Sequence, residues 1–325
     1  MLRARSAFVL ATALLAAISA PAAAQSNYPT RTITMVVPFP AGGPNDIIAR
    51  IVASALQQSL NQNVIIDNRA GAGGNPGITH AARATPDGYT LLFTSTAIAV
   101  NPGLHTNLLY DPIKDFTPIS EIVSAPNVLF VRPDSGINSI ADLVAKAKAE
   151  PDKLNYASPG VGTKSHLTGE LFKLRAGVNI QHIPYRGGGP ATQALVAGTV
   201  HMASVALAPV EPLIKSGTVR ALAVTGATRW YSLPDVPTMI ESGFPGFVSD
   251  TFNAMFAPTG TPPEIVALLV KHVREVMKRP DVVEAATKYG YQIVAGTPAE
   301  MTARLVAEIA GVKELVAKAG IKPEN

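Results

Sequence analysis

The sequence predicts an α/β fold divided into two domains, and three observations carry this prediction. Strand-like and helix-like segments alternate from residue 32 to about residue 225. The strand-like runs are short and almost continuously apolar, which is typical of strands covered by helices on both faces. The chain has 325 residues, and the roughly 300 residues of a mature chain exceed what one hydrophobic core comfortably organises.

The first 24 residues have the pattern of a cleavable secretory signal. Two arginines precede an apolar core from Ala7 to Ile18, and an Ala-Ala-Ala run ends at Ala24. Small residues in that place form a cleavage site, so the mature chain is expected to begin at Gln25. A membrane anchor is the alternative reading, but the apolar run is short for a bilayer.

The composition excludes several classes of site. The chain contains no cysteine, so disulfides, cysteine-ligated zinc and thiol nucleophiles are impossible. Removal of the signal would leave 25 basic and 23 acidic residues, a formal charge of about +2. The sequence has no basic cluster with interleaved aromatic residues, so nucleic acid is not a predicted partner.

Three strands are predicted in the first part of the chain. They are Ile33–Val37, Val64–Ile66 and Thr90–Thr94. A helix with apolar residues at helical spacing, from Ile47 to Ala55, follows the first strand. The glycine-rich segment Gly71–Gly77 follows the second, but Pro76 stands where a dinucleotide fingerprint needs its last glycine. We therefore interpret this segment as a turn and the start of a helix.

A second βα series begins at Asn127 and predicts the second domain. Its strands are Asn127–Val131, Leu154–Tyr156, Ile180–Ile183, His201–Ser204 and Ala221–Val224, and its helices are Ile140–Lys148, Ser165–Leu174, Ala191–Ala197 and Pro209–Ser216. Residues 232–250 are rich in proline, glycine and acids, which indicates a connection back to the first domain. There Asn253–Phe256 would add one more strand. The predicted domains are residues 25–126 with 248–325, and residues 127–247.

Two helices are predicted to close the chain. Each would begin with a capping box, at Thr261 and at Thr297, with proline at the first helical position. Apolar stripes from Ile265 to Val276 and from Leu305 to Val316 indicate that both helices cover the core.

The turn between the first strand and its helix, Val36–Asp46, is the main candidate site. Its Pro/Gly backbone leads into a helix that opens near Pro44. The first N–H groups of a helix lack intrahelical partners, and together with the helix dipole they favour an anion. Asp46 lies in the first helical turn, where it either contacts a ligand or caps its own helix.

A second turn of the same kind is Tyr156–His166. Gly160 and Gly162 would let the backbone approach a ligand closely, and neighbouring hydroxyls add donors. Thr163 separates Gly162 from Lys164, so this is not a Walker loop and a nucleotide is not expected. A third turn, Pro184–Pro190, carries Arg186, which either pairs with a carboxylate or is a solvated loop charge.

The sequence does not indicate an enzyme. It has no G-x-S-x-G elbow, and its six histidines are not spaced as metal ligands. No catalytic residue, metal ligand or cofactor is therefore predicted.

A series of short motifs extends over essentially the whole mature chain. They are Tyr28-Pro29, Val36–Asp46, Asn68–Asn75, Pro86–Leu92, Tyr110–Pro112, Leu154–Ser158, Ser165–Leu167, Gly169–Phe172, Ile183–Tyr185, Arg220–Thr225 and Leu233–Thr238. Each is weak alone, but in this order the chain resembles the periplasmic solute-binding proteins of tripartite tricarboxylate transporters, the Bug (Bordetella uptake gene) family.

The resemblance implies a monomeric periplasmic protein with a two-domain Venus-flytrap fold of type II, in which the chain crosses twice between the domains. It implies a small carboxylate held between the two turns, with bridging waters, and delivery to one large and one small membrane permease subunit. The expected ligand-binding residues are Phe39, Ala41, Gly42, Pro44, Asn45, Asp46, Ser95, Thr96, Ser158, Val161, Gly162, Thr163, Ser165, Val205 and Ala206.

One departure narrows the expected ligand. Many relatives carry an aspartate and an asparagine after the strand His201–Ser204, where this chain has Val205 and Ala206. Without that acid, a bound ammonium would be desolvated with no anionic partner. We therefore expect an amine-free dicarboxylate, aromatic like terephthalate or aliphatic like adipate. The alternatives are a ligand-presenting accessory to a membrane signalling receptor and, more remotely, a secreted hydrolase.

Overall fold

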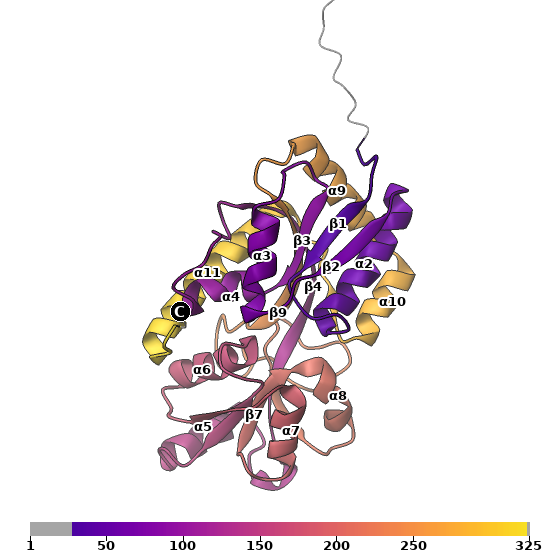
Figure 1. The fold of residues 1–325 in the computed structure, drawn as a ribbon. Helices are drawn as coiled ribbons and strands as arrows, with labels where there is room; N and C mark the ends of the chain where they lie inside the picture. Colours follow the sequence, from indigo (N-terminus) through magenta and orange to yellow (C-terminus); the bar gives the residue numbers. More distant parts are fainter. Residues whose placement is uncertain (1–27, 324–325) are drawn as a thin grey trace, which may run out of the picture.

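The computed structural model describes residues 28–323, in which two sheets lie end to end (Figure 1). The predicted signal at residues 1–24 lies outside this part of the chain. The first sheet has the order β2-β1-β3-β9-β4, with the short β10 (Gln292–Ile293) on β4. Its longer strands are β1 (Ile33–Val37), β2 (Val64–Asn68), β3 (Thr90–Ser95), β9 (Asp250–Pro258) and β4 (Phe116–Val131). The first three are parallel, and β9 runs antiparallel between β3 and β4.

The second sheet is built around the far end of β4. It contains β5 (Asn155–Ser158), β6 (Gln181–Pro184), β7 (Met202–Ala206) and β8 (Arg220–Val224). β5 is parallel to both β6 and β7, whereas β4 is antiparallel to β7 and β8. Each sheet is therefore mixed, because β4 pairs antiparallel with each of its neighbours, whereas the sequence predicted mostly parallel sheets.

β4 belongs to both sheets and is the structural link between the two halves (Figure 1). Its register pairs Phe116–Pro126 with β9, and from Asn127 onward it pairs with β7 instead. The chain returns near Ser249, whose N–H donates to the carbonyl of Thr225 before β9 begins. The domain limits predicted at 126/127 and 247/248 stay a prediction.

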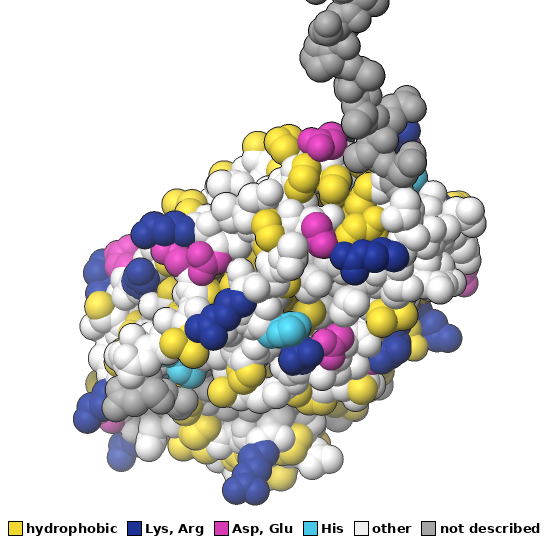
Figure 2. All heavy atoms as spheres, turned by 45° about the horizontal axis from the view of Figure 1, so that its top comes forward, with side chains coloured by type: hydrophobic (Ala, Val, Ile, Leu, Met, Phe, Trp, Pro, Cys, Tyr) yellow, Lys and Arg dark blue, Asp and Glu magenta, His cyan; other side chains and the backbone are white. Residues whose placement is uncertain are grey.

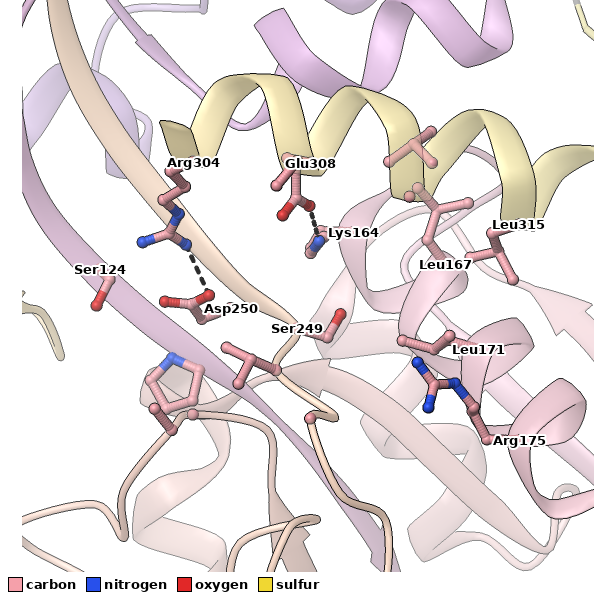
Figure 3. Close-up of a pocket in the computed structure, with 18 of the residues that line it drawn as sticks. Ser124, Lys164, Leu167, Leu171, Arg175, Ser249, Asp250, Arg304, Glu308 and Leu315 are labelled. Atoms are coloured by element: carbon pink, nitrogen blue, oxygen red, sulfur yellow. Dashed lines mark hydrogen bonds and ion pairs between the residues drawn. The ribbon is translucent and has the colours of Figure 1, made fainter. Parts of the chain in front are cut away.

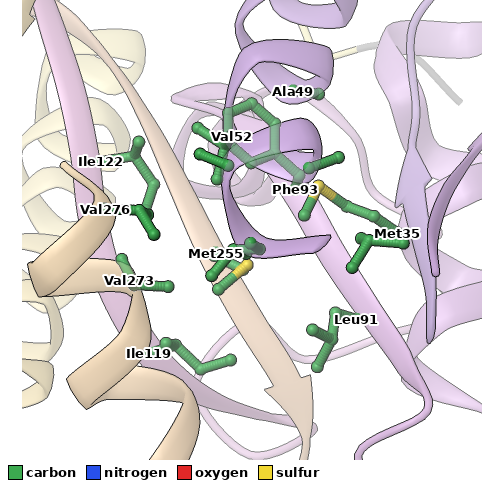
Figure 4. Close-up of a cluster of buried hydrophobic side chains, with 14 of the residues drawn as sticks. Met35, Ala49, Val52, Leu91, Phe93, Ile119, Ile122, Met255, Val273 and Val276 are labelled. Atoms are coloured by element: carbon green, nitrogen blue, oxygen red, sulfur yellow. The ribbon is translucent and has the colours of Figure 1, made fainter. Parts of the chain in front are cut away.

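Alternation along the strands of the first sheet builds a separate core on each face. Met35, Leu91 and Phe93 pack with α2 (Pro44–Leu60), α9 (Pro263–Val276) and α10 (Pro280–Lys288) (Figure 4). Val36 and Leu92, one position along, face α3 (Asn75–Ala82), α4 (Ala97–Leu104) and α11 (Pro298–Ala319).

The second sheet is covered in the same way. α5 (Ile140–Ala149) and α6 (Lys164–Ala176) pack on the face that carries Leu129 and Tyr156. α7 (Gly188–Val196) and α8 (Leu207–Lys215) cover the face that carries Val128 and Ala157. Two single 3₁₀ turns, Ala72–Gly74 and Pro133–Ser135, complete the described elements.

The predicted elements are present, but α4 and β10 were not predicted. Three further differences concern the C-terminal helices, one capping box and the lengths of two strands. Three helices follow β9 instead of two, because the nine-residue α10 has too short a pattern to stand out. The capping box at Thr297 is confirmed, but the one at Thr261 is wrong. The hydroxyl of Thr261 donates to the carbonyl of Pro258, and α9 begins after Pro262 without a side-chain cap. β4 and β9 are longer than predicted, because each continues to the neighbouring half.

Within residues 28–323, none of the helices combines the length and the apolar character needed to cross a bilayer.

Candidate ligand-binding cleft

The turn before α2 is held by the carboxylate of Asp46. Gly42 has the left-handed φ of 78°, which glycine adopts without strain. Its N–H donates to Oδ2 of Asp46 at 2.8 Å, and Arg50 Nε donates to the same oxygen at 2.8 Å. Asn68 Nδ2 donates to Oδ1 at 2.9 Å. Asp46 therefore caps the turn of its own helix, which was one of the two roles left open.

Asp46 is ionised although its side chain is buried. Burial opposes ionisation, but the hydrogen bonds from Arg50, Gly42 and Asn68 outweigh it and lower the pKa of Asp46. The residue is 1% exposed, whereas the Arg50 side chain is half exposed. A negative charge therefore sits inside the first turn of α2.

The turn before α6 repeats this backbone arrangement with different side chains. Gly162 also has a φ of 78°, and its N–H donates to Nδ1 of His166 at 3.2 Å. Thr163 is the N-cap, because its hydroxyl accepts the N–H of His166 at 3.2 Å and donates to the carbonyl of Gly160 at 2.8 Å. Thr163 therefore caps the N-terminus of α6.

Behind the α6 turn lies a buried polar cluster. Glu170 accepts from the hydroxyl of Tyr156 at 2.7 Å and from Lys173 Nζ at 2.8 and 2.9 Å. The ring of His182 stacks on that of His166, with centroids 4.2 Å apart, and Nε2 of His182 hydrogen-bonds the hydroxyl of Ser158 at 2.7 Å. Burial, with His166 and Lys173 nearby, lowers the pKa of His182 to about 3.

A cavity of about 620 Å³ lies between the two halves. From the first half it is lined by Phe39, the start of α3, the length of α4 and the tail at Ile321–Lys322. From the second half it is lined by the turn Val161–Ser165. Its charged or titratable lining residues are Lys164, Lys322 and His105, and the described lining includes no aspartate or glutamate. This lining suits an anion.

The cavity brings together about half of the predicted site residues. Those that line it are Phe39, Ser95, Thr96, Val161, Gly162, Thr163 and Ser165. Those that lie outside its lining are Ala41, Gly42, Pro44, Asn45, Asp46, Ser158, Val205 and Ala206. The α2 turn thus borders the cavity through Phe39.

The residues outside the lining occupy definite places around it. Asn45 Oδ1 accepts from Asn253 Nδ2, and Asn253 lies opposite Ser95 in the β3–β9 ladder. Val205 is buried in β7, and Ala206 is the N-cap of α8 without a side-chain hydrogen bond. Arg186 of the third turn is exposed.

Asn127 is a site-supporting residue that the sequence reasoning missed. Its Oδ1 accepts the hydroxyl of Ser165 at 2.6 Å, and its Nδ2 donates to the carbonyl of Ser249 at 2.9 Å. It therefore joins the α6 turn to both crossings between the halves. The available signal was a single amide in the otherwise apolar run from Ala125 to Val131.

A second, larger cavity of about 1240 Å³ lies between α6, α11 and the crossing strands (Figure 3). It contains none of the predicted site residues, and its central charges are already paired. Arg304 donates to Asp250 at 2.7 Å and also bonds Glu121, while Lys164 pairs with Glu308 across the two halves. Because these charges are matched internally, this cavity is the poorer candidate for a carboxylate.

Two further observations limit the possible sites. No group of three or more His, Asp or Glu side chains within residues 28–323 is arranged to hold a metal ion. On the face drawn in Figure 2, acidic and basic side chains are interspersed, with no continuous basic patch.

Two α/β halves joined by crossing strands, with helix N-termini facing a cavity between them, define the class of periplasmic binding proteins. Within that class, residues 48–321 match the family described as the tripartite tricarboxylate transporter family receptor. The chain belongs to this family of periplasmic solute-binding proteins.

Individual relatives agree with this assignment. BugT of Bordetella pertussis is 40% identical over 309 residues, which are 94% of each chain. The structure of Rpa4515 from R. palustris with adipate superposes with a TM-score of 0.76 at 36% identity, covering 92% of this chain and all of that one. MatC from Rhodopseudomonas palustris with bound malate gives a TM-score of 0.72 at 33% identity, covering 89% and 100%.

Proposed function

We propose that the protein captures an amine-free dicarboxylate in the 620 Å³ cavity and delivers it to a tripartite tricarboxylate-type membrane permease. The observation that carries the proposal is the lining itself. Its described residues include no acid, and they place Lys322 and the N-terminus of α6 beside the cavity, whereas Lys164 is already paired with Glu308. The solved structures of relatives with adipate and with malate support a dicarboxylate. Delivery to a permease rests on the family.

Backbone donors supply the grip on the first carboxylate. No acceptor within residues 28–323 takes the N–H groups of Val161, Lys164 and Ser165, and all three residues line the cavity. Such groups at the start of a helix bind anions well because the dipole adds to the hydrogen bonds. Hinge motion at the crossings would then bring the N–H groups of Asn45 and Asp46 onto the second carboxylate.

The absence of an amine on the ligand follows from the charges around the cavity. An ammonium needs a nearby carboxylate when it leaves water. The acid that many relatives carry is replaced by Val205 and Ala206, and Asp46 is occupied by three donors of its own. Glutamate and aspartate should therefore bind more weakly than acids of similar length without an amine.

Thermal shift and calorimetric titration with adipate, malate, terephthalate, citrate, glutamate and aspartate test the proposal. A dicarboxylate at about 100 times its Kd should stabilise the folded protein by ~2.7 kcal/mol, because it binds only the folded state. Equal affinity for glutamate and adipate would contradict the amine-free ligand. If no carboxylate shifted the melting temperature, carboxylate capture itself would be wrong.

Hinge closure has its own measurement. Small-angle scattering should show a smaller radius of gyration when the tightest acid of the panel is added, because the two halves move together over it. Stabilisation with an unchanged scattering profile would count against closure.

A further inference from the structure

The two turns that face the cleft are equivalent in backbone geometry. Gly42 and Gly162 share a φ of 78°, and the N-caps Gly43 and Thr163 are both extended. In each turn the glycine N–H donates to a side chain four residues later, at the third helical position. That side chain is Asp46 in α2 and His166 in α6.

The two acceptors differ in charge. Asp46 is an ionised carboxylate, whereas Nδ1 of His166 accepts an N–H and therefore carries no proton. Burial lowers the pKa of His166, and Lys173 adds to this effect against the opposing pull of Glu170. Nε2 of His166 lies 3.9 Å from Glu170, too far for a hydrogen bond.

The groups that face His166 leave it neutral on balance. On α6 they are Glu170 and Lys173, which pair with each other; Glu170 raises the pKa of His166, but burial and Lys173 outweigh it. From the sheet they are His182, stacked on the ring, and Tyr156, which donates to Glu170. The cluster therefore supplies an acceptor for Gly162 without adding a negative charge to the helix N-terminus.

The charge of this acceptor determines how strongly the helix N-terminus attracts an anionic ligand. A carboxylate at the third position satisfies the helix dipole from within, and it repels an approaching anion. A neutral acceptor holds the turn in the same shape. The positive end of the helix dipole then remains available to an anionic ligand. The α6 turn should thus bind an anion more strongly than the α2 turn, where Asp46 is balanced only by the half-exposed Arg50.

We propose that His166 is a positioning residue for ligand carboxylates: its neutral Nδ1 fixes Gly162 and aims the α6 turn, and its lack of charge makes that turn the stronger anion grip. This inference rests on the proposed function, since it concerns the same cavity. The inference gives the two turns different roles in binding. It attributes the difference to His166, which lies outside the cavity lining.

Three substitutions separate geometry from charge, with adipate, malate and terephthalate as probes. His166→Asn keeps a neutral acceptor near the position of Nδ1, so the Kd should stay within about 3-fold of wild type. His166→Ala removes the acceptor and should weaken binding by ~10-fold, the size of one lost hydrogen bond. His166→Asp restores an acceptor but adds a charge, and should weaken binding by about 10-fold or more.

Salt dependence distinguishes positioning from a general structural role. The deficit of His166→Asp should shrink as ionic strength rises, because it is electrostatic, whereas that of His166→Ala should not. A salt-independent deficit in His166→Asp, or unchanged binding in either His166→Asp or His166→Ala, would overturn the proposal.

The wild-type protein gives a test that needs no variant. Nitrogen NMR of the His166 ring at neutral pH should show the neutral tautomer protonated at Nε2. An imidazolium, or a proton on Nδ1, would overturn the proposal. These failures are distinct from failure of the proposed function, which requires that wild-type protein bind no carboxylate of the panel.

Discussion

The turn before α2 and the turn before α6 share a backbone geometry but are anchored in different ways. The α2 turn is anchored within its own half, because Asp46 takes its donors from Gly42, Arg50 and Asn68 of β2, and Asn45 accepts from Asn253 of β9. The α6 turn is tied to the rest of the molecule. Ser165 bonds Asn127 at the crossing, and Lys164 pairs with Glu308 of α11 in the other half.

Because of this difference, the two turns should respond differently to movement of the hinge between the halves. A turn anchored within one half stays fixed relative to that half, whereas a turn that is also bonded to α11 of the other half is coupled to movement of the hinge. An apolar contact reinforces the second link, since Leu104 of α4, Leu167 of α6 and Val312 of α11 share one cluster. A ligand held at the α6 turn is therefore the one placed to bias closure.

The largest expected effect is the loss of the α2 anchor. Asp46→Ala should reduce the free energy of unfolding by about 3 kcal/mol, because it leaves the donors of Gly42, Asn68 and Arg50 without their acceptor. Chemical denaturation measures this loss. Asp46→Asn is the control and should lose less, since it keeps one acceptor oxygen. A loss below that of a typical surface substitution would show that the anchor is not needed.

The two glycines provide the next comparison. Gly42→Ala and Gly162→Ala each force a left-handed backbone on alanine, which costs ~1–2 kcal/mol. A Cβ at Gly42 meets nothing within 4 Å, whereas one at Gly162 lies 2.9 Å from Leu104 Cδ1. Gly162→Ala should therefore be the more destabilising, and Leu104→Ala should reduce the excess in a double-mutant cycle. Equal losses of stability in the two variants would show that the contact with Leu104 does not contribute.

The pH dependence of stability should also differ between the turns. His182 stays neutral in the folded protein down to about pH 3, whereas an unfolded histidine takes up a proton below about pH 6.5. The unfolded state then binds more protons, so stability falls with decreasing pH from about 6.5 toward 3, by at most ~1.4 kcal/mol per pH unit.

His182→Gln should flatten this slope, because glutamine can still bond Ser158 but does not titrate. The carboxylate of Asp46, whose pKa is lowered, should cost stability only as the pH falls below about 4, toward its folded pKa. If stability depended on pH between 6.5 and 4.5 as steeply in His182→Gln as in wild type, the assignment of this pH dependence to His182 would be wrong.

The smallest effect is expected in the third turn. Arg186 is exposed, and the third position of α7 is Pro190, so this turn lacks the glycine-to-side-chain bond of the other two. Arg186→Ala should change the free energy of unfolding by less than about 0.5 kcal/mol. A larger loss in thermal denaturation would show that Arg186 has a structural partner.

The parts of the fold that were predictable are those with signals within a few residues of the sequence. The strands before both turns, the Thr297 capping box and the donor-rich turns follow from patterns within a few residues, and the structure has them. Thr261 has the same local pattern as Thr297, but the β9–α9 connection bends its hydroxyl back to Pro258. A capping motif thus depends on the preceding turn as well as on the helix.

The supporting contacts of the site were not predictable, because they join distant segments. Ser165 and Asn127 are 38 positions apart, and Ser158 meets His182 only because β5 and β6 are neighbours. His166 sits beside a predicted site residue, yet its bond to Gly162 depends on a backbone angle that the sequence does not display.

A crystal structure with adipate, malate or terephthalate, whichever raises the melting temperature most, tests the central claim most directly. We expect one carboxylate about 3 Å from the N–H groups of Val161, Lys164 or Ser165, with the other turned toward the α2 turn at Asn45. A ligand bound in the cavity between α6 and α11, or one with neither carboxylate at the α6 turn, would contradict the account.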